Sequence, residues 1–389
     1  MLKLSRKAAG IAQSEIRIMS VECEKVRGIN LAQGICDTEV PEPVQRAAIE
    51  AIRSRQNSYT RLDGVANLRR AIAQKMREYN RVEADPEREV VVSAGSTGAF
   101  YSTCVALLNP GDEIIVFEPY YGYHVNTLRA LECEPVYITL HPPEWIFCRE
   151  HLENAVTPKT RAIIVNTPSN PSGKVFSREE LEFIAQVAIQ NDLFVITDEI
   201  YEYFLYDQNQ HLSPASLPGM ADRTITISGF SKTYSITGWR IGYAVCDARW
   251  AHSIGYFHDL AYICAPSPFQ HGVAAGLEQL KPEFYRELAK EYRAKRDLLC
   301  TTLEQIGLAP YWPQGSYYVL ADGSSLPGSN SKEKAMYLLA NAGIASVPGE
   351  AFFDGGGRNL LRFCFAKTDS DLQEACRRLS RLSVTAATP

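Results

Sequence analysis

The sequence contains no apolar run long enough to cross a membrane, and its first twenty residues, MLKLSRKAAGIAQSEIRIMS, scatter charges where a secretory signal needs an apolar segment. We therefore expect a cytoplasmic protein with no membrane partner. The sequence also has only a small excess of negative over positive charge, because the formal net charge is -5 over 389 residues. That balance attracts neither nucleic acid nor anionic lipid, so small-molecule chemistry is the expected kind of function.

Cysteine patterns typical of metal or redox sites are missing as well. The ten cysteines form no C-x-x-C pair and show no metal-ligand spacing with the seven histidines. We expect no metal site, and we expect most cysteines to be reduced, buried side chains. A nucleotide-binding Rossmann protein is disfavoured too, because no G-x-G-x-x-G follows a predicted strand and Gly355-Gly356-Gly357 precedes one instead.

What the chain does contain is an alternation of short β-branched runs with segments of helical periodicity. One helical face is marked by Leu68, Ile72 and Met76. Strands that alternate with helices predict an α/β fold with a largely parallel sheet. From about residue 282 the pattern changes to a long charged amphipathic segment followed by shorter strands at 317–320 and 360–365, which predicts a second, smaller α+β domain. The six runs predicted as strands of the first part are 90–92, 113–117, 162–165, 194–197, 224–227 and 241–245.

Polar residues collect directly after these strands, where open α/β sheets bind their ligands. The first strand is followed by SAGSTG (93–98), a small-residue turn that opens a helix and would present free backbone N–H groups to an anion. The third is followed by NTPSNPSG (166–173), which is too rich in Pro and Asn to continue a regular element. Asp198 follows the fourth strand, and Lys232 follows the fifth with Arg240 eight residues later.

Each of these features alone has a commoner structural explanation as a helix cap, a turn or a surface charge. Their combination is more specific. An aldehyde cofactor needs an amine to bind it, a carboxylate to keep its ring nitrogen protonated, an anion cradle for its phosphate, and a guanidinium for the substrate carboxylate. All four kinds of group are present, on consecutive strand ends.

Three segments resemble motifs of the fold-type I, class I/II pyridoxal-phosphate (PLP) aminotransferases: SGFSKTYSITGWRIGY (228–243), NTPSNPSGKVFS (166–177) and ITDEIYEYF (196–204). The order also matches for YTRLDG (59–64), SAGSTGA (93–99) and LLRFCFA (360–366). The resemblance implies a large PLP-binding domain over 40–285, with a mostly parallel seven-stranded sheet flanked by helices. It also implies a smaller α+β domain formed by 1–39 and 286–389.

The resemblance assigns roles to individual residues. Lys232 resembles the Schiff-base lysine, Asp198 the partner of the pyridine nitrogen, and Asn170 and Tyr201 the donors to the 3-oxygen of the ring. Tyr121 resembles the stacking aromatic, Arg362 the fork for the substrate α-carboxylate, and Gly34 a substrate-loop residue. Tyr59 resembles a residue that reaches the phosphate of the neighbouring subunit, which implies a homodimer with shared active sites. The implied phosphate cradle comprises Gly95, Ser96, Thr97, Ser231 and Arg240.

The implied activity is transamination between an L-amino acid and a 2-oxo acid. The many aromatic residues favour aromatic or large neutral amino acids, with a broad or aspartate-type preference as the alternative. A PLP-dependent lyase, either a cysteine-conjugate β-lyase or a cyclopropane-forming synthase, is the rival reaction, and an aminotransferase-like regulator is the remoter one. LAQGICD (31–37) departs from the family pattern at Ile35 and Cys36. We expect Cys36 to be a packed side chain rather than a reactive thiol.

Overall fold

A computed structural model describes residues 2, 5–9 and 13–382. Its centre is a seven-stranded sheet in which only β8 runs antiparallel to its neighbours. The predicted α/β fold with a mostly parallel sheet is thus confirmed. In sheet order the strands are β2 (Val90–Ala94), β8 (Ile241–Val245), β7 (Thr224–Gly229), β6 (Phe194–Asp198), β5 (Thr160–Asn166), β3 (Glu113–Glu118) and β4 (Glu134–Thr139).

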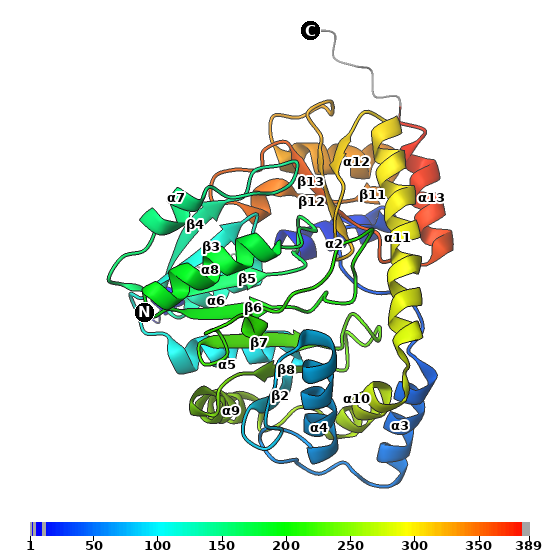
Figure 1. The fold of residues 1–389 in the computed structure, drawn as a ribbon. Coiled ribbons are helices and arrows are strands. Elements are labelled where there is room, and N and C mark those ends of the chain that lie inside the picture. The colour runs from blue at the N-terminus through cyan, green and yellow to red at the C-terminus, as the bar shows by residue number, and fades with distance from the viewer. Residues whose placement is uncertain (1, 3–4, 10–12, 383–389) are drawn as a thin grey trace.

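Helices cover both faces of this sheet, and alternate residues of each strand pack against them (Figure 1). Ile115 of β3 belongs to the core that includes Leu181 of α8, whereas its neighbour Ile114 belongs to the core that includes Phe100 of α5. A third core lies under α4 and α10, where Leu68 packs with Val92. The helices of this part are α3 (Glu42–Arg53), α4 (Ala66–Lys75), α5 (Gly95–Leu107), α6 (Gly122–Ala130), α7 (Arg149–Asn154), α8 (Arg178–Gln190), α9 (Ala248–Tyr262) and α10 (Ser267–Gln279), with a π-helical turn η1 (Met76–Asn80) and a 3-10 turn η2 (Pro214–Ser216).

The long helix α11 (Pro282–Gln305) runs along one side of the molecule and joins this part to a second, smaller layer (Figure 1). That layer contains an antiparallel sheet in the order β12-β13-β10-β9 and a separate parallel pair of β1 with β11. Its strands are β1 (Ile29–Asn30), β9 (Ala309–Tyr311), β10 (Tyr318–Asp322), β11 (Ile344–Ala345), β12 (Val347–Pro348) and β13 (Leu360–Cys364). Its helices are α2 (Glu15–Lys25), α12 (Ser331–Ala342), α13 (Asp369–Leu379) and the 3-10 turn η3 (Gly349–Phe352). A short helix α1 (Arg6–Ala9) precedes them.

The N-terminal segment contributes to the smaller layer, because β1 pairs with β11 and α2 lies beside β11 and β12. This arrangement supports a division at 1–39, 40–285 and 286–389, which stays a prediction. The expected α+β character of the C-terminal part is present in the alternation of α11 to α13 with β9 to β13. Within the described part of the chain, no helix is both long and apolar enough to span a membrane.

Candidate active site

A cavity of about 480 Å³ opens at the carboxyl ends of the parallel strands, between the central sheet and the smaller layer. Its volume is within the range of small-molecule sites. Segments far apart in the sequence meet there, because the ends of β5, β6 and β7 and the start of α5 lie at one edge of the sheet. Of the residues predicted for the site, the lining includes Gly34, Ser96, Thr97, Tyr121, Asn170, Asp198, Tyr201, Ser231, Lys232 and Arg240.

Lys232 lies three residues beyond β7 and is enclosed by the cavity walls. Its Nζ donates a hydrogen bond to the Gly34 carbonyl oxygen at 3.1 Å and lies 5.8 Å from the centre of the Tyr317 ring. Burial lowers the pKa of Lys232, and the nearby Arg240 acts in the same direction, while Cys36 opposes them. A buried amine that is readily obtained in its neutral form can attack an aldehyde and can accept a proton.

Asp198 ends β6 and is almost wholly buried at 7% exposure. Its Oδ1 accepts a hydrogen bond from the Ile200 backbone N–H at 3.3 Å, and its Oδ2 lies 3.0 Å from His124 Nε2. Sequence reasoning missed His124. The available signal was its position three residues after Tyr121 at the start of α6, which places both rings on one side of the helix, 5.2 Å apart and nearly perpendicular.

Tyr201 and Asn170 face the same cavity from two different loops. The Tyr201 hydroxyl donates to the Tyr318 hydroxyl at 3.3 Å, and burial raises the pKa of Tyr201 well above its ordinary value, so the phenol keeps its proton. The backbone of Asn170 is held by a hydrogen bond from its N–H to Asn166 Oδ1 at 2.8 Å. Its side-chain oxygen accepts a hydrogen bond from Arg362 at 2.9 Å. Both side chains therefore have fixed positions.

The predicted phosphate cradle forms where α5 begins. Gly95 has φ +73°, and a Cβ on it would overlap the guanidinium of Arg240, so glycine allows this close approach. Arg240 itself has φ +56°, a strained conformation for a residue with a side chain, and one of its nitrogens donates to the Thr237 carbonyl at 3.0 Å. Within the described residues no carboxylate pairs with Arg240. The guanidinium and the N-terminus of a thirteen-residue helix thus converge without an anion, which is the donor set that a phosphate fits.

Three predicted residues lie outside the cavity lining. Arg362 is fully buried behind Asn170, donates to the Ala32 carbonyl at 2.5 Å, and stacks 4.3 Å from the Tyr318 ring centre. Gly95 supports the cradle from beneath. Tyr59 is 82% exposed and does not line the cavity of its own chain.

Cys36 is buried rather than open to the cavity. Its Sγ approaches the Lys232 carbonyl oxygen at 3.6 Å, and burial raises the pKa of the thiol. The thiolate is therefore disfavoured, in agreement with the expectation that Cys36 is a packed side chain.

Arg17 is a second residue that the sequence did not reveal. It lies in the first turn of α2 and lines both the main cavity and an adjoining cavity of about 580 Å³. The other charged residues of the adjoining cavity have partners: Glu15 pairs with Lys332, Arg129 pairs with Asp354, and Glu350 accepts hydrogen bonds from Ser331. Among the described side chains no carboxylate pairs with Arg17, so a positive charge stands where the two cavities meet.

Comparisons with known proteins agree with this geometry. The family model for aminotransferase class I and II matches residues 26–379. The probable N-succinyldiaminopimelate aminotransferase of Mycobacterium tuberculosis is 37% identical, over 95% of this chain and 96% of its own length. Kynurenine–oxoglutarate transaminase of Dictyostelium discoideum is 34% identical, over 92% and 91%. The solved structure of the N-succinyldiaminopimelate aminotransferase from M. tuberculosis superposes with a TM-score of 0.94 at 36% identity, covering 97% of this chain and 99% of that one.

The family match spans both layers of the fold, and Lys232, Asp198 and most of the residues predicted for a phosphate cradle line one cavity. The chain belongs to the class I and II aminotransferase family, and it is a PLP-dependent enzyme that transfers an amino group between an amino acid and a 2-oxo acid.

Proposed function

We propose that Lys232 tethers PLP and then acts as the base, with the cofactor phosphate held by Ser96, Thr97, Ser231 and Arg240. PLP supplies, when bound, an aldehyde that takes up the amino group and a ring that withdraws electrons. The observation that carries this proposal is the partly buried Lys232 amine in the cavity wall, whose lowered pKa favours the neutral form that can accept the α-proton of a substrate.

The remaining residues of the site orient and hold charge. Asp198 is held by His124 and by the Ile200 backbone, so its carboxylate can keep a proton on the pyridine nitrogen. Asn170 would donate to the ring oxygen through its amide nitrogen, and Tyr201 would do so in exchange for its present hydrogen bond to Tyr318. Arg362 binds the α-carboxylate of the substrate, which requires an exchange of its present hydrogen bond to the Ala32 carbonyl.

The substrate class that we propose is a large amino acid, with aromatic and other large neutral side chains favoured. The walls beside Lys232 supply aromatic surface from Tyr121, Tyr123 and Tyr318. Arg17 makes a substrate with an acidic side chain the alternative, because its unpaired charge lies where the side chain of a long substrate would end. The two relatives named above are named for kynurenine, which is aromatic, and for an N-succinyl amino acid, which is long and acidic.

The first test is the absorption spectrum of the purified protein with PLP, for wild type and Lys232→Ala. We expect a cofactor band that requires Lys232, disappears when an amino acid is added and returns when a 2-oxo acid is added. Asp198→Ala should retain the fold and lose most of the rate. Release of pyruvate and ammonia without an amino acceptor would instead establish the lyase reaction, and a band that never cycles would favour a regulator.

Arg17→Gln tests the choice between neutral and acidic side chains. We expect the KM for substrates with a distal carboxylate to rise about tenfold, the size of one lost charge-assisted hydrogen bond, while the KM for phenylalanine stays the same. Arg362→Lys is the matched control, because it should raise KM for every substrate: an ammonium cannot replace the bidentate fork. Equal effects of Arg17→Gln on both substrate classes would contradict a specific acidic subsite.

We also propose a cytoplasmic homodimer in which Tyr59 completes the phosphate site of the partner. The exposure of Tyr59 supports this arrangement, since a tyrosine with 82% of its surface in water has no packing role in its own chain. The division into a large domain (40–285) and a small domain (1–39 and 286–389) is part of the same proposal.

A further inference from the structure

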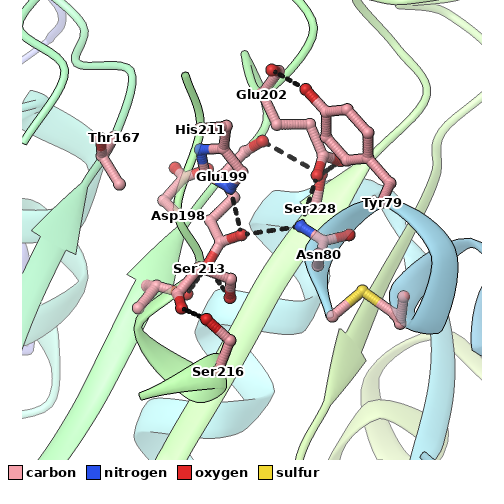
Figure 2. Close-up of polar contacts among 12 residues, drawn as sticks. Tyr79, Asn80, Thr167, Asp198, Glu199, Glu202, His211, Ser213, Ser216 and Ser228 are labelled. Atoms are coloured by element: carbon pink, nitrogen blue, oxygen red, sulfur yellow. Dashed lines mark hydrogen bonds and ion pairs between the residues drawn. The ribbon is translucent and has the colours of Figure 1, made fainter. Parts of the chain in front are cut away.

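A second cluster of ionisable groups lies just beyond the carboxyl end of β6 (Figure 2). Its centre is formed by two buried carboxylates, Glu199 and Glu202, with exposures of 0% and 2%. Figure 2 shows Glu199 surrounded by His211, Asn80 and Ser213. None of these residues lines the main cavity, so the chemistry proposed above does not use them.

Glu199 has four hydrogen-bonding partners from three segments of the chain: the end of β6, the loop at 211–213 and the turn η1. Its Oε1 accepts from Thr197 Oγ1 and from Ser213 Oγ, both at 2.8 Å. Its Oε2 lies 2.7 Å from His211 Nε2 and 3.3 Å from Asn80 Nδ2. Hydroxyl and amide donors that converge on one carboxylate fix its position.

Glu202 is held in a similar way from another direction. Its Oε1 accepts from Lys75 Nζ at 2.5 Å and from Ser228 Oγ at 3.0 Å, and its Oε2 accepts from Asn80 Nδ2 at 2.9 Å. Burial alone would raise the pKa of Glu202, but Lys75 and His211 outweigh it, and the pKa lies below its ordinary value. Asn80 contacts both carboxylates, so the two halves form one network.

The π-helical turn η1 explains why these donors meet. Lys75 precedes this turn and Asn80 ends it, five residues later. A π-helix closes i to i+5 hydrogen bonds, so residues five apart lie on the same side of it, which an α-helix would not allow. The rare turn therefore brings the Lys75 ammonium and the Asn80 amide to the same carboxylate, Glu202, and Asn80 also reaches Glu199.

A metal ion is not needed to account for this cluster. The ligand atoms of Glu199, Glu202 and His211 are close enough together to surround a cation. However, the Lys75 ammonium already lies 2.5 Å from Glu202, and a divalent ion there would meet its repulsion. Lys75 serves as the cation of the network.

We propose that Glu199 and Glu202 are positioning residues that hold Asp198, Tyr201 and Lys232 at the separations their chemistry needs; this inference rests on the roles proposed above for those three residues. Each carboxylate is adjacent in sequence to one of them: Glu199 follows Asp198, and Glu202 follows Tyr201. Ser228, which donates to Glu202, lies on β7 four residues before Lys232.

Side-chain alternation makes this arrangement effective. Consecutive residues at a strand end point to opposite faces, so Asp198 enters the cavity while Glu199 is fixed behind the sheet. The Glu199 N–H continues the β6 to β7 pairing by donating to the Ile227 carbonyl at 2.8 Å. A shift of Glu199 would therefore move the Asp198 carboxylate relative to the Lys232 amine.

The test compares wild type with Glu199→Gln, an isosteric change, and with Lys75→Met combined with Glu202→Gln, which removes the ion pair without leaving a lone buried charge. We expect the dissociation constant for PLP to rise about tenfold, as for the loss of one hydrogen bond to a charged group. We also expect the pH midpoint of the bound cofactor's absorption band to shift. In the cofactor-free proteins, amide hydrogen exchange should quicken at 198–202 and 228–232.

Lys334→Met is the matched control, because Lys334 is buried like Lys75 but donates to the Leu326 and Gly328 carbonyls, which belong to the smaller layer and not to the cluster. It should lower the melting temperature and leave the cofactor affinity, the band midpoint and the exchange at 198–202 unchanged. The inference is overturned if the Glu199 and Glu202 variants behave like this control. If the wild type shows no Lys232-dependent band, the proposed roles fail, and the exchange measurement still decides whether the cluster holds these segments.

Discussion

His258 illustrates how a single residue outside the cavity can control the cofactor site. It is fully buried in α9, and its Nε2 accepts a hydrogen bond at 2.8 Å from the N–H of Ala94, the residue before the phosphate cradle. Accepting through Nε2 requires the neutral ring. Burial lowers the pKa of His258 to about 4, from an ordinary value of 6.5, so the ring stays neutral over most of the pH range.

The expected consequence is acid sensitivity of the cradle. Between pH 6.5 and about 4 the unfolded chain binds a proton at this histidine that the native protein does not, so stability falls as pH falls through this window. His258→Gln keeps an acceptor but cannot titrate. Its melting temperature should fall less than that of wild type between pH 6.5 and 4.5, as measured by circular dichroism of the cofactor-free protein. Parallel curves for the two proteins would show that His258 has no such role.

The burial of Lys232 gives a pH dependence of the same sign as that of His258, but in an alkaline window. Its lowered pKa means that the unfolded lysine binds a proton more readily than the native one below pH 10.5, so burial costs stability at low and neutral pH and the cost fades as pH rises towards 10.5. Lys232→Met should therefore raise the melting temperature of the cofactor-free protein at pH 7, and the gain should shrink at pH 10. A gain that stays constant with pH would reflect packing instead of charge.

The residues that were easiest to predict are those in sequence motifs directly after a strand. Lys232, Asp198 and Asn170 follow strands within specific motifs, and the cavity brings them together. His124 and Arg17 were missed because both lie inside helices, α6 and α2, and not in the motif that directly follows a strand. Their roles depend on the way in which α6 and α2 pack around the cavity, and that packing is a tertiary property which no local pattern encodes.

At the scale of elements, all six strands predicted for the first part are present, because each is buried on both faces and reads as a continuous apolar run. The edge strand β4 was not predicted. It contains Glu134 and Pro135, and most of its residues are only partly buried, so it lacks that apolar signature. The short strands β1, β11 and β12 were not predicted for a different reason. Each has only two residues, too few to show a periodicity, and is defined only by its pairing with another strand.

The start of α8 offers an element-scale prediction. Ser177 Oγ accepts from the Glu180 N–H at 3.2 Å, and Glu180 Oε2 accepts from the Ser177 N–H at 2.8 Å, which completes a capping box. Ser177→Ala should lower the free energy of unfolding by about 1 kcal/mol, measured by chemical denaturation, with kcat unchanged. Ser177→Thr retains the cap and is the matched control. A loss of activity in Ser177→Ala at full folding would mean that α8 influences the site.

At the scale of the whole molecule, the cavity has walls from the sheet, from the N-terminal segment and from the smaller layer, while the exposed Tyr59 remains unused within its own chain. If Tyr59 completes the partner's site, two defective variants should complement each other. A mixed dimer of Lys232→Ala and Tyr59→Ala subunits has one site with both defects and one site with neither. Random re-pairing of equal amounts makes about half of the dimers mixed, so about a quarter of the sites regain wild-type turnover.

The experiment mixes the two purified variants under conditions that exchange subunits and follows transamination over time. Activity should rise from the low level of Tyr59→Ala towards about a quarter of the wild-type rate, because intact sites form only in mixed dimers. Mixing Lys232→Ala with Asp198→Ala is the control: in the proposed arrangement both residues serve the cavity of their own chain, so no intact site can form. Equal rates in the two mixtures, with subunit exchange verified, would mean that each chain builds its site alone and that Tyr59 does not cross to its partner.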